Sequence, residues 1–269
     1  MNYSEIIREI EKTLQKNGFD YKKKIEEMLH MKNIGLRKQG KQFSFNEHIE
    51  GLLLSLLSSQ RPWGPIQTNM ETIREIFHQF SKSKLLATDP DELIQNITGI
   101  SCGNRAIKKQ MYDLKNNILL FEKIESKFGS LDAFVTSDSP TTIAKSLSDA
   151  SGPYKLKQVG YALALEYLRN VGIDAVKPDT HIMRILGRDR LGFSEGTPTQ
   201  QEAVDIMENI SQETGHSKAY LDALFWTLCA TNAAAICQES PKCQICQLNR
   251  HCRCSKTKSF YEERSLLRN

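Results

Sequence analysis

Five of the seven cysteines lie within 18 consecutive residues, and this cluster constrains the fold more than any other feature of the chain. The five are Cys237, Cys243, Cys246, Cys252 and Cys254. The first residues lack the basic and then apolar segments of a secretory signal, so we expect the chain in the cytoplasm. In a reducing compartment, clustered thiols indicate a metal site rather than a set of disulfides.

The spacing of these cysteines narrows the choice of metal. The run reads Cys237-x5-Cys243-x2-Cys246-x5-Cys252, and four thiolates from one loop suit either a tetrahedral Zn²⁺ site or a [4Fe–4S] cluster. Zinc sites usually combine two Cys-x2-Cys pairs that are far apart in sequence, whereas this loop has a single such pair between two outlying cysteines. The spacing therefore favours a [4Fe–4S] cluster held by these four residues.

Basic residues are interleaved with the cysteines. From Lys242 to the last residue there are seven Lys or Arg and two Glu, so this segment carries the basic excess behind the chain's net charge of +4. The loop could therefore present cations such as Lys242 to phosphate groups, or the basic tail could simply be solvated. On the first interpretation the metal stabilises the loop that presents these cations and has no redox role.

The rest of the sequence predicts an all-α fold. Polar caps precede apolar runs of helical spacing, as in Ser44-Phe45-Asn46-Glu47, and Asp89 and Ser139 each precede a proline at a predicted first helical position. Thr197-Pro198 with Gln200 predicts one more capped helix, which Gly215 ends. No segment alternates with a period of two, and no apolar run is long enough for a membrane span.

Two neighbouring segments carry candidate chemistry. Residues 156–164 combine Val159, Gly160 and the small Ala164 in a pattern that predicts a tight hairpin between two packed helices, the second ending near Asn170. Backbone amides at the start of that second helix suit a single phosphate. Farther along, Pro178 and Asp179 predict a helix start, with Asp179 as its cap.

In this order, the hairpin, the segment Asp179-Thr180-His181-Ile182-Met183-Arg184 and the cysteine loop resemble the helix–hairpin–helix DNA glycosylases of the endonuclease III superfamily. The resemblance extends from about Asn46 to Cys252. It implies two helical subdomains with a DNA groove between them: residues 46–172 as a helical barrel ending in the hairpin, and residues 1–45 with 173–269 as the cluster subdomain. It also implies that Asp179 is the catalytic carboxylate.

The resemblance implies further DNA contacts. Leu56-Leu57-Ser58-Ser59-Gln60 is similar to the segment whose glutamine fills the gap left by an extruded base, and Gly99-Ile100 to the loop whose apolar residue wedges into the opposite strand. A helix-terminal polar residue and a core side chain are the simpler alternatives for Gln60 and Ile100. The implied contact residues are Gln60, Ile100, Lys157, Val159, Gly160, Tyr161 and Lys242, with Trp63 and Tyr154 as candidates for stacking on a flipped base or for ordinary packing.

Three departures from the family pattern bear on the site. The loop has five residues between its first two cysteines where the family usually has six, so Cys254 could compete with Cys252. Gln158 stands where the hairpin usually has its first glycine, which predicts an altered hairpin. Ala162 stands where the bifunctional members carry a nucleophilic lysine, although a shifted alignment would bring Lys155 or Lys157 to that place.

The sequence therefore predicts a DNA N-glycosylase of base excision repair that hydrolyses the N-glycosidic bond with Asp179 and leaves an abasic site uncleaved. The alternatives are a bifunctional glycosylase/lyase that uses Lys157 or Lys155, and a non-catalytic iron–sulfur protein that binds damaged DNA. The expected partner is duplex DNA with a damaged or mispaired base. We expect a monomer without membrane contacts, associated with the nucleoid if the source is bacterial or archaeal.

Overall fold

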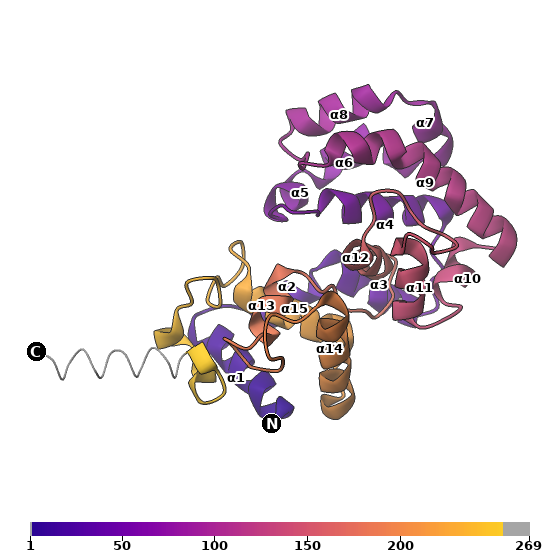
Figure 1. Ribbon diagram of the computed structural model, residues 1–269. Coiled ribbons are helices and arrows are strands. Elements are labelled where there is room, and N and C mark those ends of the chain that lie inside the picture. Colours follow the sequence, from indigo (N-terminus) through magenta and orange to yellow (C-terminus); the bar gives the residue numbers. More distant parts are fainter. Residues whose placement is uncertain (1, 255–269) are drawn as a thin grey trace, which may run out of the picture. The chain divides into compact units, whose positions relative to one another are not determined.

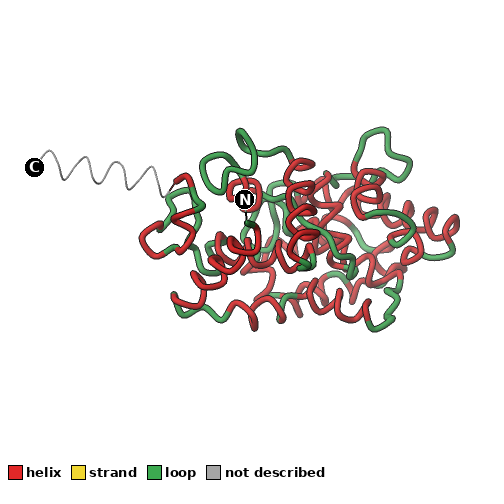
Figure 2. The backbone as a smooth tube through the Cα atoms, turned by 90° about the horizontal axis from the view of Figure 1, so that it is seen from below, coloured by secondary structure: helices red, strands yellow, loops and turns green. Residues whose placement is uncertain are grey.

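In the computed structural model of the protein, residues 2–254 are described, and every regular element among them is a helix (Figure 2). This confirms the predicted all-α class. The four basic residues of the predicted tail that lie outside the described part are Lys256, Lys258, Arg264 and Arg268. Among residues 2–254, none of the helices combines the length and the apolar character that a bilayer crossing requires.

The chain forms two compact units, one spanning Leu29–Ala175 and one that joins the segment up to Met28 with the segment from Val176 onward. Figure 1 colours the first unit mainly purple to magenta, and the second indigo at its N-terminal part and orange to yellow at its C-terminal part. The helices of the first unit are α3 (Leu29–Lys38), α4 (Phe45–Leu57), α5 (Gly64–Thr68), α6 (Met70–Ile76), η1 (His78–Phe80), α7 (Lys82–Ala87), α8 (Pro90–Gly99), α9 (Ile107–Phe128), α10 (Leu131–Val135), α11 (Pro140–Ser148) and α12 (Tyr161–Asn170). Those of the second are α1 (Tyr3–Lys16), α2 (Tyr21–Glu26), α13 (Thr180–Leu186), α14 (Gln200–Thr214), α15 (Lys218–Cys229), η2 (Cys243–Ile245) and η3 (Gln247–Arg250).

The predicted caps set most helix starts. Ser44 and Glu47 form a complete capping box on α4, and the side chains of Asp89 and Ser139 accept hydrogen bonds from the first turns of α8 and α11. Helix α14 begins two residues later than predicted, because Thr199 pairs with Glu202 in a capping box. Thr197 and Gln200 therefore do not form the predicted box, whereas Gly215 ends the helix in the left-handed conformation as expected.

Helix α12 packs closely against α4 in the core of the 29–175 unit. A Cβ on Gly51 of α4 would lie 2.9 Å from Cγ1 of Val171, so this position accepts only glycine without a shift. Asn170 Nδ2 donates to the carbonyl of Gly51 (3.0 Å), and Ser55 Oγ donates to the carbonyl of Leu163 (2.6 Å). These bonds fix α12, and with it the end of the hairpin, on a rigid support.

A buried polar network explains why residues 29–45 belong to the 29–175 unit and not to the cluster subdomain in which we predicted them. The guanidinium of Arg37 donates two hydrogen bonds to Asp132, at 2.5 and 3.0 Å, and further bonds to the carbonyl of Val171. His48 lies 3.5 Å from the Asp132 carboxylate through Nε2, and its Nδ1 lies 2.7 Å from the hydroxyl of Tyr167 in α12. These bonds join α3, α4, α10 and α12.

The other unit is built around α15, which packs against α1, α2, α13 and α14. The N-terminal helix α1 also contacts η3, within the cysteine loop. Thr13 Oγ1 accepts from the backbone of Gln247 (2.9 Å), and Asn17 Nδ2 donates to the carbonyl of Ile245 (3.2 Å). The first helix therefore anchors the cysteine loop from one side.

Candidate functional site

The predicted hairpin is present between α11 and α12 (Figure 1). The loop folds back on the end of α11, since the backbone amides of Tyr154 and Leu156 donate to the carbonyls of Ser146 (3.2 Å) and Leu147 (2.9 Å). Ala164 is fully buried within α12, as its small size predicted. The two helices pack directly against each other.

Gln158 adopts a backbone conformation that favours glycine. Its φ of +61° lies in the left-handed region, which costs a side-chain-bearing residue about 1 kcal/mol. Its Nε2 donates to Oδ2 of Asp113 in α9 (2.8 Å), which offsets that cost. The altered hairpin expected at Gln158 stays a prediction, and the side chain supplies an anchor to α9.

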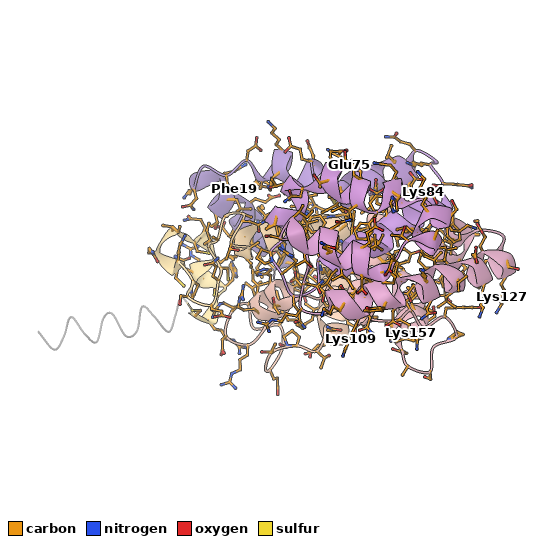
Figure 3. All side chains as sticks on the ribbon, turned by 90° about the horizontal axis from the view of Figure 1, so that it is seen from above. Phe19, Glu75, Lys84, Lys109, Lys127 and Lys157 are labelled. Carbon is orange, nitrogen blue, oxygen red and sulfur yellow. The ribbon has the colours of Figure 1, made fainter. Side chains whose placement is uncertain are left out.

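Asn117 of α9 clamps the same loop. Its buried side chain accepts from the backbone amide of Lys157 (2.7 Å) and donates to the carbonyl of Lys157 (3.1 Å). The Lys157 side chain itself is exposed, and Figure 3 shows Lys157 and Lys109 at the same edge of the ribbon. The hairpin tip is thus held by α9 while its cation points to solvent.

The start of α12 is open. Gly160 is the N-cap, no side chain caps this helix, and a Cβ built on Gly160 would meet nothing within 4 Å. Its φ of −90° is accessible to any residue, so neither sterics nor backbone conformation requires a glycine here. The first turn of α12 therefore has no side-chain cap, and a helix start of this kind can bind an anion that approaches the backbone closely.

The other hairpin residues take different positions. Val159 is buried, so only its backbone can reach a ligand, and Tyr161 is half-buried in the first turn of α12. Ala162 lies in the same turn. Tyr154 packs edge-on against Phe128 and Phe134, and its hydroxyl accepts from Lys127 Nζ (2.6 Å). This packing does not support the predicted stacking of Tyr154 on a flipped base.

Lys155 is turned toward the protein. Its ammonium donates to the carbonyls of Leu156 (2.9 Å) and Val159 (2.5 Å), across the tip of the hairpin. Burial, and next the nearby charge of Lys157, lower the pKa of this amine. Lys155 therefore holds two carbonyls of the hairpin together through its ammonium group.

The two segments that resemble the gap-filling and wedging loops lie side by side. Gln60, which follows the end of α4, is exposed with a φ of +52°, and Ile100 is the half-buried C-cap of α8. Ser101 after it adopts a φ of +55° and closes a Schellman-type turn, with amides of Ser101 and Cys102 donating to Thr98 and Ile97. Trp63 is half-buried at the start of α5.

In the other unit, Asp179 caps α13 as predicted. Its Oδ1 accepts hydrogen bonds from the amides of His181 (2.8 Å) and Ile182 (3.0 Å), and Asp179 is half-buried. One carboxylate oxygen therefore satisfies both amides. The N-terminal end of a helix dipole attracts negative charge, so the position suits a carboxylate.

Arg184 links the Asp179 helix to the cysteine loop. Its guanidinium donates to Nδ1 of His181 (2.9 Å) and to the carbonyl of Cys237 (3.4 Å). Because Arg is always a donor, Nδ1 of His181 accepts, and burial lowers the pKa of this imidazole. The neutral imidazole and the guanidinium thus hold the first turn of α13.

The cysteine loop follows α15. Cys237 is buried beside Cys229, whose thiol donates a hydrogen bond that, together with Arg190 and Arg184, lowers the pKa of Cys237 to about 7. Cys243 Sγ lies 3.9 Å from Cys254 Sγ, and Lys242 is exposed. Within residues 2–254, no three His, Cys, Asp or Glu side chains lie close enough together to hold one metal ion.

Several residues of these sites were not predicted from sequence. They are Arg61, Asp113, Asn117, Cys229 and the φ of Gln158. For Asn117 a signal existed, because it lies on the apolar face of its helix, with Leu114 and Ile118. The others have no local pattern that marks them.

The chain was compared with known families, curated proteins and solved structures. No family model matches the chain, and no curated protein matches it. Among solved structures, an endonuclease III trapped as a covalent intermediate with DNA is 18% identical, with a TM-score of 0.62 over 96% of this chain and 99% of that one. The 8-oxoguanine glycosylase/lyase of Methanocaldococcus jannaschii, in complex with DNA containing 8-oxoguanine, is 20% identical, with a TM-score of 0.57 over 83% and 96%. The 8-oxoguanine DNA glycosylase of Thermotoga maritima is 17% identical, with a TM-score of 0.53 over 85% and 97%.

The chain therefore has the helix–hairpin–helix fold of these DNA glycosylases, as the resemblance in sequence predicted.

Proposed function

We propose that the protein is a DNA N-glycosylase that acts as a monomer on duplex DNA containing a damaged or mispaired base. The observation that carries this proposal is Asp179, a half-buried carboxylate that caps α13 in the fold of DNA glycosylases and begins an Asp-Thr-His-Ile-x-Arg segment. Cleavage of the N-glycosidic bond builds positive charge on the deoxyribose. A fixed carboxylate at that sugar stabilises the charge.

The capping geometry suits this role. Both capping bonds end on Oδ1 of Asp179, and no donor within residues 2–254 is bonded to its Oδ2. Oδ2 can then face the sugar or accept a proton from the attacking water. Asp179 would act both as electrostatic stabiliser and as general base for hydrolysis.

The hairpin would bind one DNA phosphate. The open amides of α12 at Gly160 accept an anion, and the exposed Lys157 adds a cation at the same tip. Contacts of this kind read no base sequence, so they fit an enzyme that scans duplex DNA for rare lesions. Gln60 and Ile100 would then enter the duplex at the extruded base, which costs a few kcal/mol of unstacking.

We propose that the enzyme lacks lyase activity. Ala162, in the first turn of α12, offers no amine, and the ammonium of Lys155 is engaged by two hairpin carbonyls. A Schiff base at Lys155 would require loss of both bonds and of the proton. Borohydride treatment of the protein with DNA containing an abasic site tests this, and a covalent adduct that disappears in Lys157→Met or Lys155→Met would reverse the proposal.

The cysteine loop would hold a [4Fe–4S] cluster through Cys237, Cys243, Cys246 and Cys252. Four thiols on one loop match its donor set, and each thiolate binds a different iron, so the sulfurs need not converge on one ion. Such a cluster would staple the loop that carries Lys242 and Arg250. Iron and sulfide analysis with visible absorbance tests the cofactor, and the spectra of Cys252→Ser and Cys254→Ser would identify which of these two cysteines is the fourth ligand.

The function itself is tested by base release. Genomic DNA that has been alkylated, oxidised or deaminated is incubated with the wild-type protein and with Asp179→Asn, and free bases are identified by mass spectrometry. We expect one base class from the wild type and none from the variant. Binding of abasic duplex without release from any DNA pool would favour the non-catalytic alternative.

A further inference from the structure

Two loops of the 29–175 unit are tied together by one side chain. Arg61 Nη1 donates to the carbonyl of Gly103 (2.6 Å) and its Nη2 to the carbonyl of Ser101 (2.6 Å). Arg61 directly follows Gln60, and Ser101 directly follows Ile100. One guanidinium therefore joins the residues adjacent to both side chains that would enter the duplex.

Further bonds make the two loops a single unit. Asn104 Nδ2 donates to the carbonyl of Leu56, near the end of α4 (2.8 Å), and the buried Cys102 thiol donates to the carbonyl of Pro65 in α5 (3.4 Å). Two of the residues involved, Gln60 and Ser101, hold left-handed backbone conformations without being glycine. Each such residue costs about 1 kcal/mol or more and persists only where its surroundings impose it.

Arg61 is suited to impose this geometry. A guanidinium is planar and presents its N–H groups in a fixed fork, so two bonds to carbonyls two residues apart fix both the distance and the orientation of the loops. Its Nε is buried without a hydrogen-bond partner among the described residues. An orphaned N–H of this kind costs free energy, which the two short bonds must repay.

We propose that Arg61 is a positioning residue that holds Gln60 and Ile100 at a fixed separation, so that both enter the duplex at the same nucleotide. This inference rests on the proposed function, since it assigns both side chains to the probing of DNA. On this proposal the Gln60 loop and the Ile100 loop act together on the DNA. Loss of the bridge would let the two loops move independently and would remove their joint preference for a damaged site.

The test measures preference for damage rather than catalysis. Affinities for a duplex with one abasic site and for the intact duplex are measured for wild type, Gln60→Ala, Ile100→Ala and Arg61→Met. We expect each single variant to reduce the ratio of the two affinities by about tenfold. If Arg61 couples the loops, adding Gln60→Ala or Ile100→Ala to Arg61→Met produces less than a threefold further loss.

Two further variants separate geometry from charge. Arg61→Lys keeps the charge but cannot bridge two carbonyls, so we expect it to behave like Arg61→Met, and recovery of the wild-type ratio would overturn the proposal. Arg74→Met is the matched control, because Arg74 in α6 also bridges two acceptors, Glu50 and Glu71, away from these loops. We expect it to leave the ratio unchanged.

The outcome does not depend on base release. If Arg61→Met does not fold, as judged by circular dichroism and thermal unfolding, the wild-type cycle of Gln60→Ala and Ile100→Ala still decides: coupled losses support a shared device, and independent losses contradict it. Coupled losses in a protein that releases no base would count against the proposed function only. Base release with independent losses would count against Arg61 only.

Discussion

Two helix starts in this molecule are capped in opposite ways. Helix α12 has Gly160 as its N-cap, which brings no side chain, so no side-chain oxygen caps its first turn. Helix α13 begins at Asp179, whose Oδ1 accepts two of its first amides. The start of α12 can bind an anion from a ligand, whereas the start of α13 is capped by the carboxylate of Asp179. The positive end of a helix dipole thus faces a proposed phosphate site at one start and a carboxylate of the chain itself at the other.

The largest expected effect comes from removing the charge at α13 while keeping the cap. Asparagine caps a helix about as well as aspartate does, so Asp179→Asn should leave the stability nearly unchanged. It should lower the single-turnover rate of base release by about 10³-fold, because the developing positive charge loses its counter-charge. Asp179→Ala, which also loses the cap, separates the two roles in urea unfolding. Equal rates for wild type and Asp179→Asn would show that α13 carries no catalytic group.

The second prediction concerns the support beneath α12. Burial alone would raise the pKa of Asp132, but the neighbouring His48 and the hydrogen bonds from Arg37 hold it well below its usual range, whereas burial lowers the pKa of His48. The lowered pKa of Asp132 stabilises the fold at neutral pH, and this stabilisation is lost as pH falls below about 4, where the unfolded chain takes up a proton. The lowered pKa of His48 contributes nothing at neutral pH but destabilises the fold below about pH 6.5, where the unfolded imidazole is protonated and the buried one is not.

Asp132→Asn should lower the free energy of unfolding at pH 7 by about 3 kcal/mol, because Arg37 loses its buried partner. It should also flatten the pH dependence below about pH 5. Urea unfolding between about pH 2 and 8 measures both. Asp205→Asn, at an exposed carboxylate of α14, is the control that should change neither, and an unchanged acid limb in Asp132→Asn would refute this account of the network.

The third prediction tests the open start of α12. In Gly160→Ala the new methyl group meets no protein atom, so stability should be equal or slightly higher, while affinity for duplex DNA should fall about tenfold because the phosphate loses its close approach. Gly51→Ala is the reciprocal control. Its methyl group would lie 2.9 Å from Val171 Cγ1, so it should lower stability and leave the affinity of the folded protein unchanged.

The smallest expected effect distinguishes conformation from anchoring at Gln158. Gln158→Ala loses the bond to Asp113 and keeps the left-handed backbone, so it should lower the free energy of unfolding by about 1 kcal/mol. Gln158→Gly loses the same bond but relieves the backbone, so the net change should be close to zero. Equal losses in both variants, measured by urea unfolding, would mean that the φ of this residue carries no cost.

Sequence alone determined what depends on short stretches of chain. The all-helical class followed from capping residues and apolar periodicity, and the Ser44 box, the Asp179 cap and the end of α14 at Gly215 lie where those patterns predict. The one misplaced start, that of α14, shows the limit, because Thr197 and Thr199 offer equivalent caps. Such signals act over three or four residues, and tertiary packing decides between neighbouring candidates.

Only the tertiary structure decided how the hairpin and the paired loops are held. The Asn117 clamp, the Gln158 anchor and the Arg61 bridge each join residues 40 or more positions apart in the sequence. The same holds for the bonds from Arg37 to Asp132, which bring residues 29–45 into the hairpin-bearing unit. Local patterns specify which elements form. Contacts of this range depend on how those elements pack, because a side chain acquires its partner only when distant helices meet.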